Sequence, residues 1–447
     1  MEQEHYSLRI PDTKKKRIVI IGGGFGGMNI IKHLDSDLFQ IVLFDLNNYH
    51  TFVPLLYQVA TAGIEPDSII DPLRNLVERG RDFHFRMMKI NHIDPGAQCV
   101  ETIVGPLHYD YLVIATGTKS NFFGNKSIEK YGLPLRTLRD ALDLRSQILQ
   151  NFEKATISNN LSEQDRLTNF VIVGGGPTGV ELAGALAELR KNVFPYDYPE
   201  LDMGMMHIYL VHSRPHLLPY MNEKGGIQAE KYLLEMGVEL KLGTKVISYD
   251  GRTAGLSDES TIETEGLIWC AGVRGAAIEG LSEECLEKGS YLVNEFNQIK
   301  GYENIFAIGD IAMHRTEKYP DGYPGVAQTA IQQGKHLAKN LIHQERQRPM
   351  TPFVYFDKGT IATIGRNKAV ADLFGKVRTG GWFAWFTWWV IHIYYLVGFR
   401  NKMGTMANWI LNYFSYKNSS RLIVRPYLQP DDHVGQEIIA NNDEDAP

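Results

Sequence analysis

Most of what this sequence predicts begins in one stretch, RIVIIGGGFGGMNIIKHLDSDLFQIVLFD, which runs from Arg17 to Asp45. A β-branched run is followed by a glycine-rich turn, a helical pattern, a second apolar run and an acid. This order is typical of a domain that binds a dinucleotide. Gly22 makes the tight turn, Gly24 lets the backbone approach a pyrophosphate, and Gly27 lets the helix pack on the strand. The pyrophosphate would lie at the amino end of the helix, and Asp45 would accept hydrogen bonds from the ribose hydroxyls.

A second copy of this plan begins at Phe170. Its glycine turn places Gly174, Gly176 and Gly179 in the corresponding positions, and a helix and another apolar strand follow. Two copies so far apart indicate two nucleotide-binding domains, because solenoid repeats have much shorter periods. The second strand ends in His212, where an acid would favour NADH, and a neutral or cationic side chain there tolerates the 2′-phosphate of NADPH.

Two dinucleotide sites indicate a tightly held flavin, FAD, and an exchanging nicotinamide nucleotide, NADH or NADPH. A late apolar run at residues 305–308 ends in Gly309 and Asp310, and we expect it to share a sheet with the early strands, the second domain being inserted between them. Asp310 is then the expected ligand of the ribityl or pyrophosphate part of FAD. A helix beginning near Ala327 would direct its positive end at the flavin, although ordinary surface glutamines would give the same pattern.

Composition limits the electron acceptor. The net charge is -6, so nucleic acid is not an expected partner, because phosphate neutralisation needs a basic surplus. The 3 cysteines form no paired motif, which excludes a disulfide reductase, a zinc site and an iron–sulfur cluster. No signal peptide or metal site is expected. The acceptor is therefore external, and the candidates are a quinone, oxygen or a small electron-transfer protein.

The C-terminal region has a different character. Residues 382–399 carry no formal charge and are half aromatic, and a helix of that length would be about 27 Å long. Because tryptophan and tyrosine favour the headgroup level, we expect attachment to one membrane surface. A buried core helix, an oligomer interface and a membrane span are the alternatives. The next segment has an expected apolar stripe and basic flanks for anionic lipid. The stripe is Met403, Met406, Ile410, Tyr413 and Phe414, opposite Thr405, Asn408, Asn412 and Ser415, and the flanks are Arg400, Lys402, Lys417, Arg421 and Arg425.

From Lys16 to Arg425 the chain resembles the type II NADH dehydrogenases, single-subunit flavoenzymes that reduce membrane quinone without pumping protons. The motifs that carry the resemblance are GGGFGG at residue 22, HTFVPLLYQ at 50, ATG at 115, GGGPTGVELAG at 174, FAIGD at 306, and AQ at 327 with QQ at 332. The resemblance implies an α/β fold with two Rossmann-type domains in a glutathione-reductase-like arrangement, plus a C-terminal membrane-associated module.

The resemblance also implies roles for individual residues. Glu181 would lie near the point where nicotinamide meets flavin, and Gln328 and Gln332 would line the flavin–quinone junction. His212 departs from the acid that is usual in the family. Further cofactor contacts are expected from Ala115, Thr116, Gly117, Ala271, Gly272 and Ala327.

The expected domains follow the two copies. We expect an FAD-binding domain in two parts, 1–120 and 291–350, around an NAD(P)H-binding domain at 121–290, then the C-terminal module at 351–430 and a flexible acidic tail at 431–447. The expected protein is peripheral to the cytoplasmic face of the inner membrane, and a homodimer is compatible with the sequence. A soluble NAD(P)H-dependent flavin reductase that serves a redox-protein partner is the main alternative, and a non-catalytic redox sensor is a weaker one.

Overall fold

The computed structural model describes residues 6–414 and 421–428, apart from 76, 78, 79 and 424. These residues form two compact units. The first unit comprises Met1–Thr51, Asp71–Lys119 and Val273–Asp357, and the second comprises Phe52–Ile70, Ser120–Gly272 and Lys358–Pro447. Phe52–Ile70 and the C-terminal residues thus belong with the second nucleotide fold. Lys417, Ser415 and the acidic tail at 431–447 lie outside the described residues.

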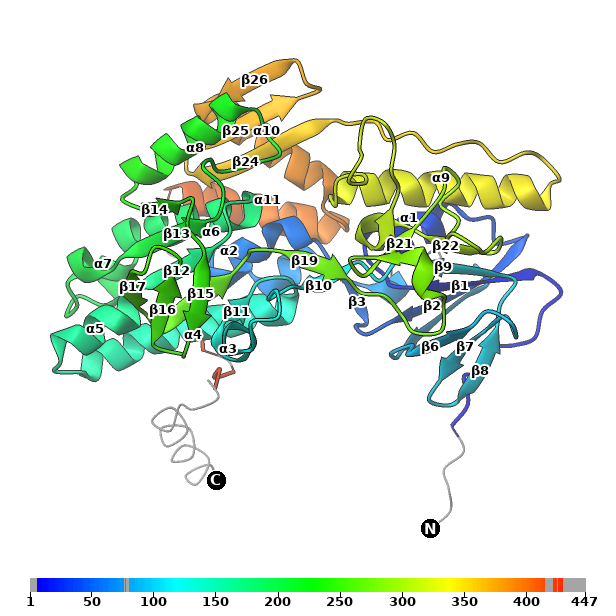
Figure 1. The fold of residues 1–447 in the computed structure, drawn as a ribbon, viewed down its shortest axis with the longest axis horizontal. Helices are drawn as coiled ribbons and strands as arrows, with labels where there is room; N and C mark the ends of the chain where they lie inside the picture. Colours follow the sequence, from blue (N-terminus) through cyan, green and yellow to red (C-terminus); the bar gives the residue numbers. More distant parts are fainter. Residues whose placement is uncertain (1–5, 76, 78–79, 415–420, 424, 429–447) are drawn as a thin grey trace, which may run out of the picture. The chain divides into compact units, whose positions relative to one another are not determined.

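A parallel five-stranded sheet forms the first unit, in the order β22-β9-β1-β2-β5 (Figure 1). The edge strand β22, Ile305–Ala307, pairs with β9, so the late run joins the early strands as the sequence predicts. β-Branched and aromatic residues fill the strands because both faces of the sheet are covered. The other strands of the sheet are β1 (Lys16–Ile21), β2 (Phe39–Asp45), β5 (Phe83–Met87) and β9 (Tyr111–Ile114).

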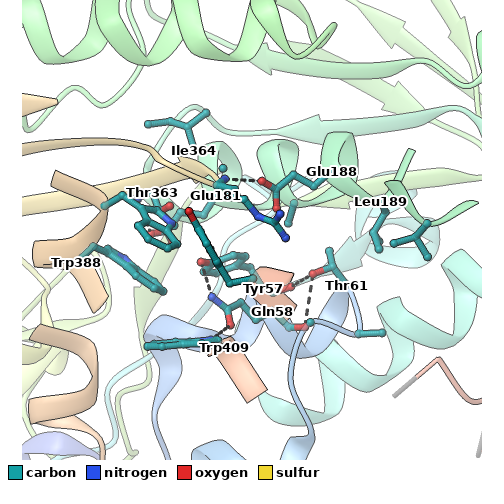
Figure 2. Close-up of a pocket in the computed structure, with 18 of the residues that line it drawn as sticks. Tyr57, Gln58, Thr61, Glu181, Glu188, Leu189, Thr363, Ile364, Trp388 and Trp409 are labelled. Atoms are coloured by element: carbon teal, nitrogen blue, oxygen red, sulfur yellow. Dashed lines mark hydrogen bonds between the residues drawn. The ribbon is translucent and has the colours of Figure 1, made fainter. Parts of the chain in front are cut away.

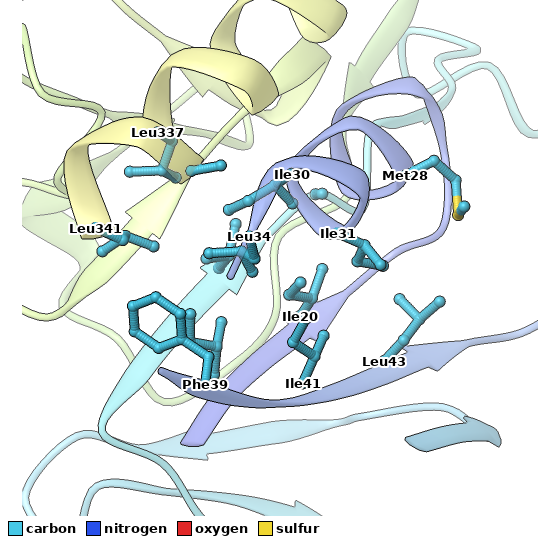
Figure 3. Close-up of a cluster of buried hydrophobic side chains, with 14 of the residues drawn as sticks. Ile20, Met28, Ile30, Ile31, Leu34, Phe39, Ile41, Leu43, Leu337 and Leu341 are labelled. Atoms are coloured by element: carbon cyan, nitrogen blue, oxygen red, sulfur yellow. The ribbon is translucent and has the colours of Figure 1, made fainter. Parts of the chain in front are cut away.

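Two helices cover one face of this sheet. They are α1, Phe25–His33, and α9, Ala327–Glu345, and Figure 3 shows Ile30 of α1 and Leu337 of α9 together above the strands. The helices approach closely, because a Cβ on Gly334 would lie 2.6 Å from the Gly26 carbonyl oxygen. The opposite face is covered by short strands: β6 (His92–Asp94), β7 (Cys99–Thr102), β8 (Gly105–His108), β20 (Leu286–Glu287), β21 (Ser290–Leu292) and β23 (Ala312–Met313).

The second unit repeats the parallel sheet, in the order β11-β18-β12-β13-β14. Its strands are β11 (Leu133–Pro134), β12 (Phe170–Val173), β13 (Ile208–His212), β14 (Glu239–Leu242) and β18 (Gly266–Trp269). Its helices are α2 (Leu56–Ala60), α3 (Lys126–Tyr131), α4 (Leu138–Ile157), α5 (Leu161–Thr168), α6 (Pro177–Asn192), α7 (Phe194–Asp197) and α8 (Glu223–Glu235), and a small sheet adds β15 (Val246–Tyr249), β16 (Thr253–Leu256) and β17 (Thr261–Glu263). The remaining short strands of the chain are β3 (Tyr49–Thr51), β4 (Ile70–Pro72), β10 (Thr118–Ser120) and β19 (Val273–Gly275).

The C-terminal part of the second unit is an antiparallel sheet followed by two helices. The sheet consists of β24 (Gly359–Gly365), β25 (Lys368–Leu373) and β26 (Val377–Gly380). Helix α10, Gly381–Tyr395, packs on β25, and β24 packs on α6. Residues 382–399 are not one helix as expected, because the chain is extended at Leu396 and has a positive φ of 83° at Gly398 before α11, Phe399–Phe414. Among the described residues, no helix combines the length and apolar character needed to cross a bilayer.

Part of the apolar stripe expected along α11 faces outward. Met403 and Ile410 of this stripe are exposed, whereas Thr405, expected on the opposite side, is fully buried. The reason is that α11 packs on the 3-10 turn Pro66–Ile69, where main-chain carbonyl groups need donors. Asn401 Nδ2 donates to Ile70 O over 2.7 Å, and Thr405 Oγ1 lies 3.5 Å from Ser68 O.

The contact of α6 with β24 depends on one missing side chain. A Cβ on Gly184 would overlap the Ile364 carbonyl oxygen. We therefore expect Gly184→Ala to lower the free energy of unfolding by about 1–3 kcal/mol or more, the usual cost of overpacking. Gly404→Ala, in the exposed part of α11 with open space around its Cβ position, is the matched control and should be neutral or stabilising by up to about 1 kcal/mol. Urea denaturation of both variants measures the difference, and equal stabilities would contradict the assigned contact.

Candidate functional site

The first glycine turn is closed on one side and open on the other. Gly22 has a φ of 108°, and a Cβ there would overlap the Ala115 carbonyl oxygen. A Cβ on Gly27 would overlap the Gly22 carbonyl oxygen, so only glycine allows α1 to leave the strand so tightly. Around Gly24, by contrast, no atom lies within 4 Å of the Cβ position. The turn therefore has the backbone cradle that the pyrophosphate of FAD needs.

Asp45 and His50 hold this turn from the neighbouring segment. Asp45 Oδ2 accepts a hydrogen bond of 2.6 Å from Gly23 N, and Oδ1 accepts one of 2.7 Å from Asn47 N. Burial raises the pKa of Asp45, and these N–H groups oppose the shift. His50 Nδ1 lies 2.9 Å from Gly23 O, and burial lowers the pKa of His50 to about 4. The imidazole is therefore neutral and donates from Nδ1, a role that the sequence analysis missed.

The residues that follow β9 and β22 are also arranged around this unit's sheet edge. Thr116 Oγ1 donates to Ala276 O over 2.8 Å, and Ala276 N donates to the Gly117 carbonyl over 3.0 Å. The Cβ position of Gly325 lies 3.5 Å from the Asp310 carboxyl carbon. The two hydrogen bonds fix the chain at Thr116 and Gly117, two of the positions expected to bind FAD, and the space beside Asp310 depends on the missing side chain of Gly325.

Helix α9 begins at Ala327, as predicted, and its glutamines divide their roles. Buried Gln333 accepts from Gly309 N over 2.7 Å and so joins α9 to the turn that holds Asp310. Gln332 uses both ends of its amide on the main chain of Phe356, with distances of 2.9 and 3.0 Å. Gln332 thus holds the extended segment before β24, and its catalytic role stays a prediction. Gln328 lies half-buried in the first turn of α9.

The second glycine turn has the same geometry. Gly174 has a φ of 119° with its Cβ position 2.7 Å from Cys270 O, a Cβ on Gly179 would overlap Gly174 O, and the space around Gly176 is open within 4 Å. The strand before Cys270 thus supports this turn as the Ala115 strand supports the first. The next two residues, Ala271 and Gly272, follow the same strand end, and Gly272 has a φ of 130°.

His212 occupies the place that Asp45 has in the first turn. Gly175 N donates to His212 Nδ1 over 3.1 Å, so Nδ1 is the acceptor and the ring proton resides on Nε2. Burial and the charge of Arg214 lower the pKa of His212, which keeps the imidazole neutral. Nε2 is buried and has no hydrogen-bond partner among the described residues. The second unit therefore has a neutral imidazole at the strand end where the first unit has the Asp45 carboxylate.

A cavity of about 170 Å³ lies within the second unit (Figure 2). It is lined by residues of α2, α6 and β24 and by aromatic side chains of α10 and α11, and it is open on one side. The tryptophan rings are in contact: Trp388 and Trp409 have centroids 5.2 Å apart, and so do Trp389 and Trp409. The lining residues that matter for its chemistry are Tyr57, Gln58, Glu181, Glu188, Trp388 and Trp409.

Glu181 lies in the wall of this cavity and is buried. Its Oε1 is 3.5 Å from Thr363 N. Burial raises the pKa of Glu181 to about 8, although the neighbouring N–H groups of Thr363 and Trp388 oppose the shift. The carboxyl group is therefore protonated at neutral pH and can donate a proton into an apolar, aromatic cavity.

A hydrogen-bonded chain orients the donors opposite Glu181. The indole of Trp409 is a donor only, and its Nε1 donates to Gln58 Oε1 over 2.7 Å. The amide nitrogen of Gln58 then donates to the Tyr57 hydroxyl oxygen over 2.9 Å. Because the Tyr57 oxygen accepts this bond, its own hydrogen is available to another acceptor. The sequence analysis assigned no role to Tyr57, Gln58 or Trp409, because they meet only in the folded unit.

Comparison with known proteins agrees with this arrangement. Residues 16–334 match the family model for pyridine nucleotide-disulphide oxidoreductases, and residues 358–416 match the NDH2 C-terminal domain. The chain is 35% identical over 426 residues to the type II NADH:quinone oxidoreductase Ndh of Mycobacterium tuberculosis, covering 92% of this chain and 90% of that protein. The chain belongs to the type II NADH:quinone oxidoreductase family.

Other relatives extend the comparison. The type II NADH:quinone oxidoreductase of Staphylococcus saprophyticus is 28% identical over 81% of this chain and 90% of its own length. The fold is shared with NDH2 from Plasmodium falciparum in complex with NADH, with a TM-score of 0.84 at 20% identity over 92% of this chain and all of that one. Family membership confirms the predicted FAD-dependent NADH:quinone oxidoreductase with two Rossmann-type domains. The roles of the individual site residues stay predictions.

The first turn makes a direct prediction about flavin retention. Asp45→Ala removes the acceptor of the Gly23 N–H group and the expected ligand of the ribose, and a hydrogen bond to a charged group contributes about 1.5–3 kcal/mol. We expect FAD to bind at least about tenfold more weakly, as measured by equilibrium titration of the flavin-free protein. Asp37→Ala, at an exposed position in the same unit, is the control. Equal affinity in the two variants would remove Asp45 from the FAD site.

Proposed function

We propose that this chain is a membrane-attached enzyme that passes electrons from NADH through FAD to a membrane quinone without pumping protons. The observation that carries the quinone as acceptor is the aromatic cavity with the protonated Glu181 in its wall. A quinone has a flat ring that stacks on indoles and two carbonyl oxygens that must gain protons on reduction. Ferricyanide, which takes electrons alone, provides a comparison acceptor in the assay of the purified protein.

The chain's own residues supply binding, orientation and proton delivery, while bound FAD supplies the hydride and electron chemistry. The open spaces at Gly24 and Gly176 admit the two pyrophosphates. Glu181 offers a proton within the cavity, and the chain from Trp409 through Gln58 orients the Tyr57 hydroxyl. We propose Gln328 as a further contact at the flavin–quinone junction, on the family resemblance and its place in the first turn of α9.

The outer face of α10 supports attachment to a membrane. Side chains at helical spacing along it are exposed, among them Phe383 at 70%, Phe386 at 46% and Val390 at 54%. Trp382 and Tyr394 extend this α10 stripe at the two ends. Such exposed apolar surface on one helix is unfavourable in water, and each large side chain that enters the interface contributes about 1.5–3 kcal/mol before a discount for incomplete burial.

The basic residues contribute less to lipid binding than the sequence suggests. Arg421 forms an ion pair of 2.6 Å with Asp197, and Arg425 pairs with Asp143, so these two expected flank residues are used within the unit. The side chain of Arg400 lies outside the described residues. We propose the exposed Lys376 of the β25–β26 turn and Lys402, whose Nζ donates to Tyr394 O over 2.9 Å, as the cations that meet anionic lipid. We propose that the protein is peripheral to the cytoplasmic face of the inner membrane, where NADH is available.

The α10 stripe can be tested without removing the module, which must stay because Trp388 is buried and Trp409 bonds Gln58. The triple variant combines Phe383→Ser, Phe386→Ser and Val390→Ser. We expect it to float with anionic liposomes at least about tenfold less than the wild type, because it loses several kcal/mol of apolar burial in the membrane interface. Ferricyanide reduction should be unchanged. The control replaces exposed apolar residues elsewhere in the second unit: Ile157→Ser, Tyr196→Ser and Tyr220→Ser.

Two results would contradict membrane attachment through this stripe. Flotation of the triple variant equal to that of the control would place the lipid contact elsewhere. A wild-type homodimer that the triple variant converts to monomer, measured by analytical ultracentrifugation without flotation of either form, would assign the α10 stripe to a second copy of the chain. In that case the soluble reductase with a redox-protein partner becomes the better proposal.

The orphaned N–H of His212 predicts nucleotide choice. A neutral donor offers no repulsion to the 2′-phosphate, so we expect NADH oxidation together with measurable NADPH oxidation. His212→Glu should shift the ratio of the kcat/KM values for NADH and NADPH toward NADH. His212→Gln should not, because glutamine has the shape of glutamate without its charge. Steady-state kinetics with both nucleotides measures the shift. Rejection of NADPH by the wild type beyond about a thousandfold, or about 4 kcal/mol, would rule out this role for His212.

A further inference from the structure

Helix α6 carries a second carboxylate in the wall of the cavity. Glu188 follows Glu181 by two helical turns, so both side chains project from one face of α6, about 10 Å apart along its axis. Figure 2 shows both residues on this helix, with Tyr57 drawn across the cavity from them. A carboxylate pair on one wall of a cavity is a costly arrangement unless the groups have partners or a function.

The two carboxyl groups have different access to solvent. Glu181 is buried, whereas Glu188 is only half-buried. The Glu188 carboxylate accepts a hydrogen bond from the main-chain N–H of Arg366, in the turn between β24 and β25. Burial raises the pKa of Glu188, and the N–H and charge of Arg366 oppose the shift. Glu188 is therefore the member of the pair whose side chain reaches closer to solvent.

Tyr57 lies within electrostatic reach of both carboxylates. Burial raises the pKa of its phenol well above the usual range, and the charges of Glu181 and Glu188 raise it further. The phenol therefore stays protonated, and its hydrogen is not used by Gln58, which donates to the same oxygen. The cavity of about 170 Å³ has room for several water molecules at about 30 Å³ each. The Tyr57 hydroxyl, together with water that a bound quinone leaves in the cavity or that fills it before quinone enters, can connect the two carboxyl groups.

We propose that Glu188 takes up a proton from solvent and passes it through Tyr57 and cavity water to Glu181. This inference rests on the proposed reduction of quinone. Reduction to quinol takes two electrons and two protons; NADH supplies both electrons and, in its hydride, one of the two hydrogens, so one proton must come from solvent. Glu181 gives up that proton to the quinone oxygen and is reprotonated through Glu188. Glu188 acts through Tyr57 and Glu181 and does not contact quinone.

The proton path from Glu188 through Tyr57 to Glu181, called the relay below, predicts that the rate of quinone reduction depends on pH. The sign of this dependence follows from the pKa of Glu181. Its proton-carrying form is present below about pH 8 and is lost as the pH rises through that value. The other titratable groups that line the cavity with Glu188 are Tyr57, Arg366, Tyr413 and Arg421. The phenol of Tyr57 titrates above its usual range, so an activity loss near pH 8 reports the carboxyl group of Glu181.

The first test measures proton access directly and needs no turnover. The carboxylic acid band of Glu181 is identified in the infrared spectrum as the band that Glu181→Gln removes, and its shift is then followed after rapid mixing into D₂O. We expect Glu188→Gln and Tyr57→Phe each to slow this exchange at least about tenfold. Glu235→Gln, which removes an exposed carboxylate paired with Lys368 over 2.6 Å, is the control. Exchange at the wild-type rate in both relay variants would overturn the proposal.

The second test compares quinone, which takes up electrons and protons, with ferricyanide, which takes up electrons alone. We expect Glu188→Gln to lower quinone reduction at least about tenfold, with ferricyanide reduction unchanged, and Glu188→Asp or added formate to restore part of the loss. The fall in activity near pH 8 should shift in Glu188→Gln and stay in place in Glu235→Gln. Equal losses with both acceptors would make Glu188 a structural residue and overturn the relay. A wild type that reduces ferricyanide but no quinone would instead contradict the proposed function, and the exchange experiment would still test the relay.

Discussion

The structure depends on main chain approaching main chain where no side chain intervenes. In the first unit, Gly27 lies over the Gly22 carbonyl and Gly22 lies against Ala115. Any larger residue would separate α1 from its strand and close the open space at Gly24. The second unit repeats this arrangement at Gly174 and Gly179. Both nucleotide sites therefore rest on steric exclusion, and the polar residues around them refine positions that the glycines create.

A third close approach connects the second nucleotide fold with the C-terminal sheet. Gly184 lets β24 lie directly on α6, so that helix serves two purposes. Its first turn belongs to the glycine cradle, and its middle forms a wall of the tryptophan-lined cavity. The cavity thus exists because a helix of one Rossmann-type domain is also the support of the C-terminal module. This shared helix explains why the C-terminal residues form one compact unit with the second nucleotide fold.

Desolvation sets the chemistry of that cavity. An ionised carboxylate among indole rings would cost several kcal/mol, so Glu181 keeps its proton to about pH 8. The same burial keeps the phenol of Tyr57 protonated. In the second glycine turn burial acts in the opposite direction on a base and holds His212 neutral. Desolvation therefore gives a protonated carboxyl group in the cavity and an uncharged imidazole at the end of β13.

Sequence patterns between neighbouring residues were sufficient to predict the strands of the two parallel sheets and the two glycine turns. They also predicted that α9 starts at Ala327 and that His212 stands where an acid is usual. Each of these features depends on residues close in sequence. These patterns did not reveal the partners of Thr405, Arg421 and Gln332, which are Ser68, Asp197 and Phe356. They also could not bring Trp409 to Gln58, or Tyr57 into the same cavity as Glu181 and Glu188. Those contacts join segments that are distant in sequence, and helical periodicity says which side chains share a face but not what that face will meet. Only the packing of α11 on the turn at Pro66–Ile69 decided which groups its inward side meets, namely the carbonyl oxygens of Ser68 and Ile70.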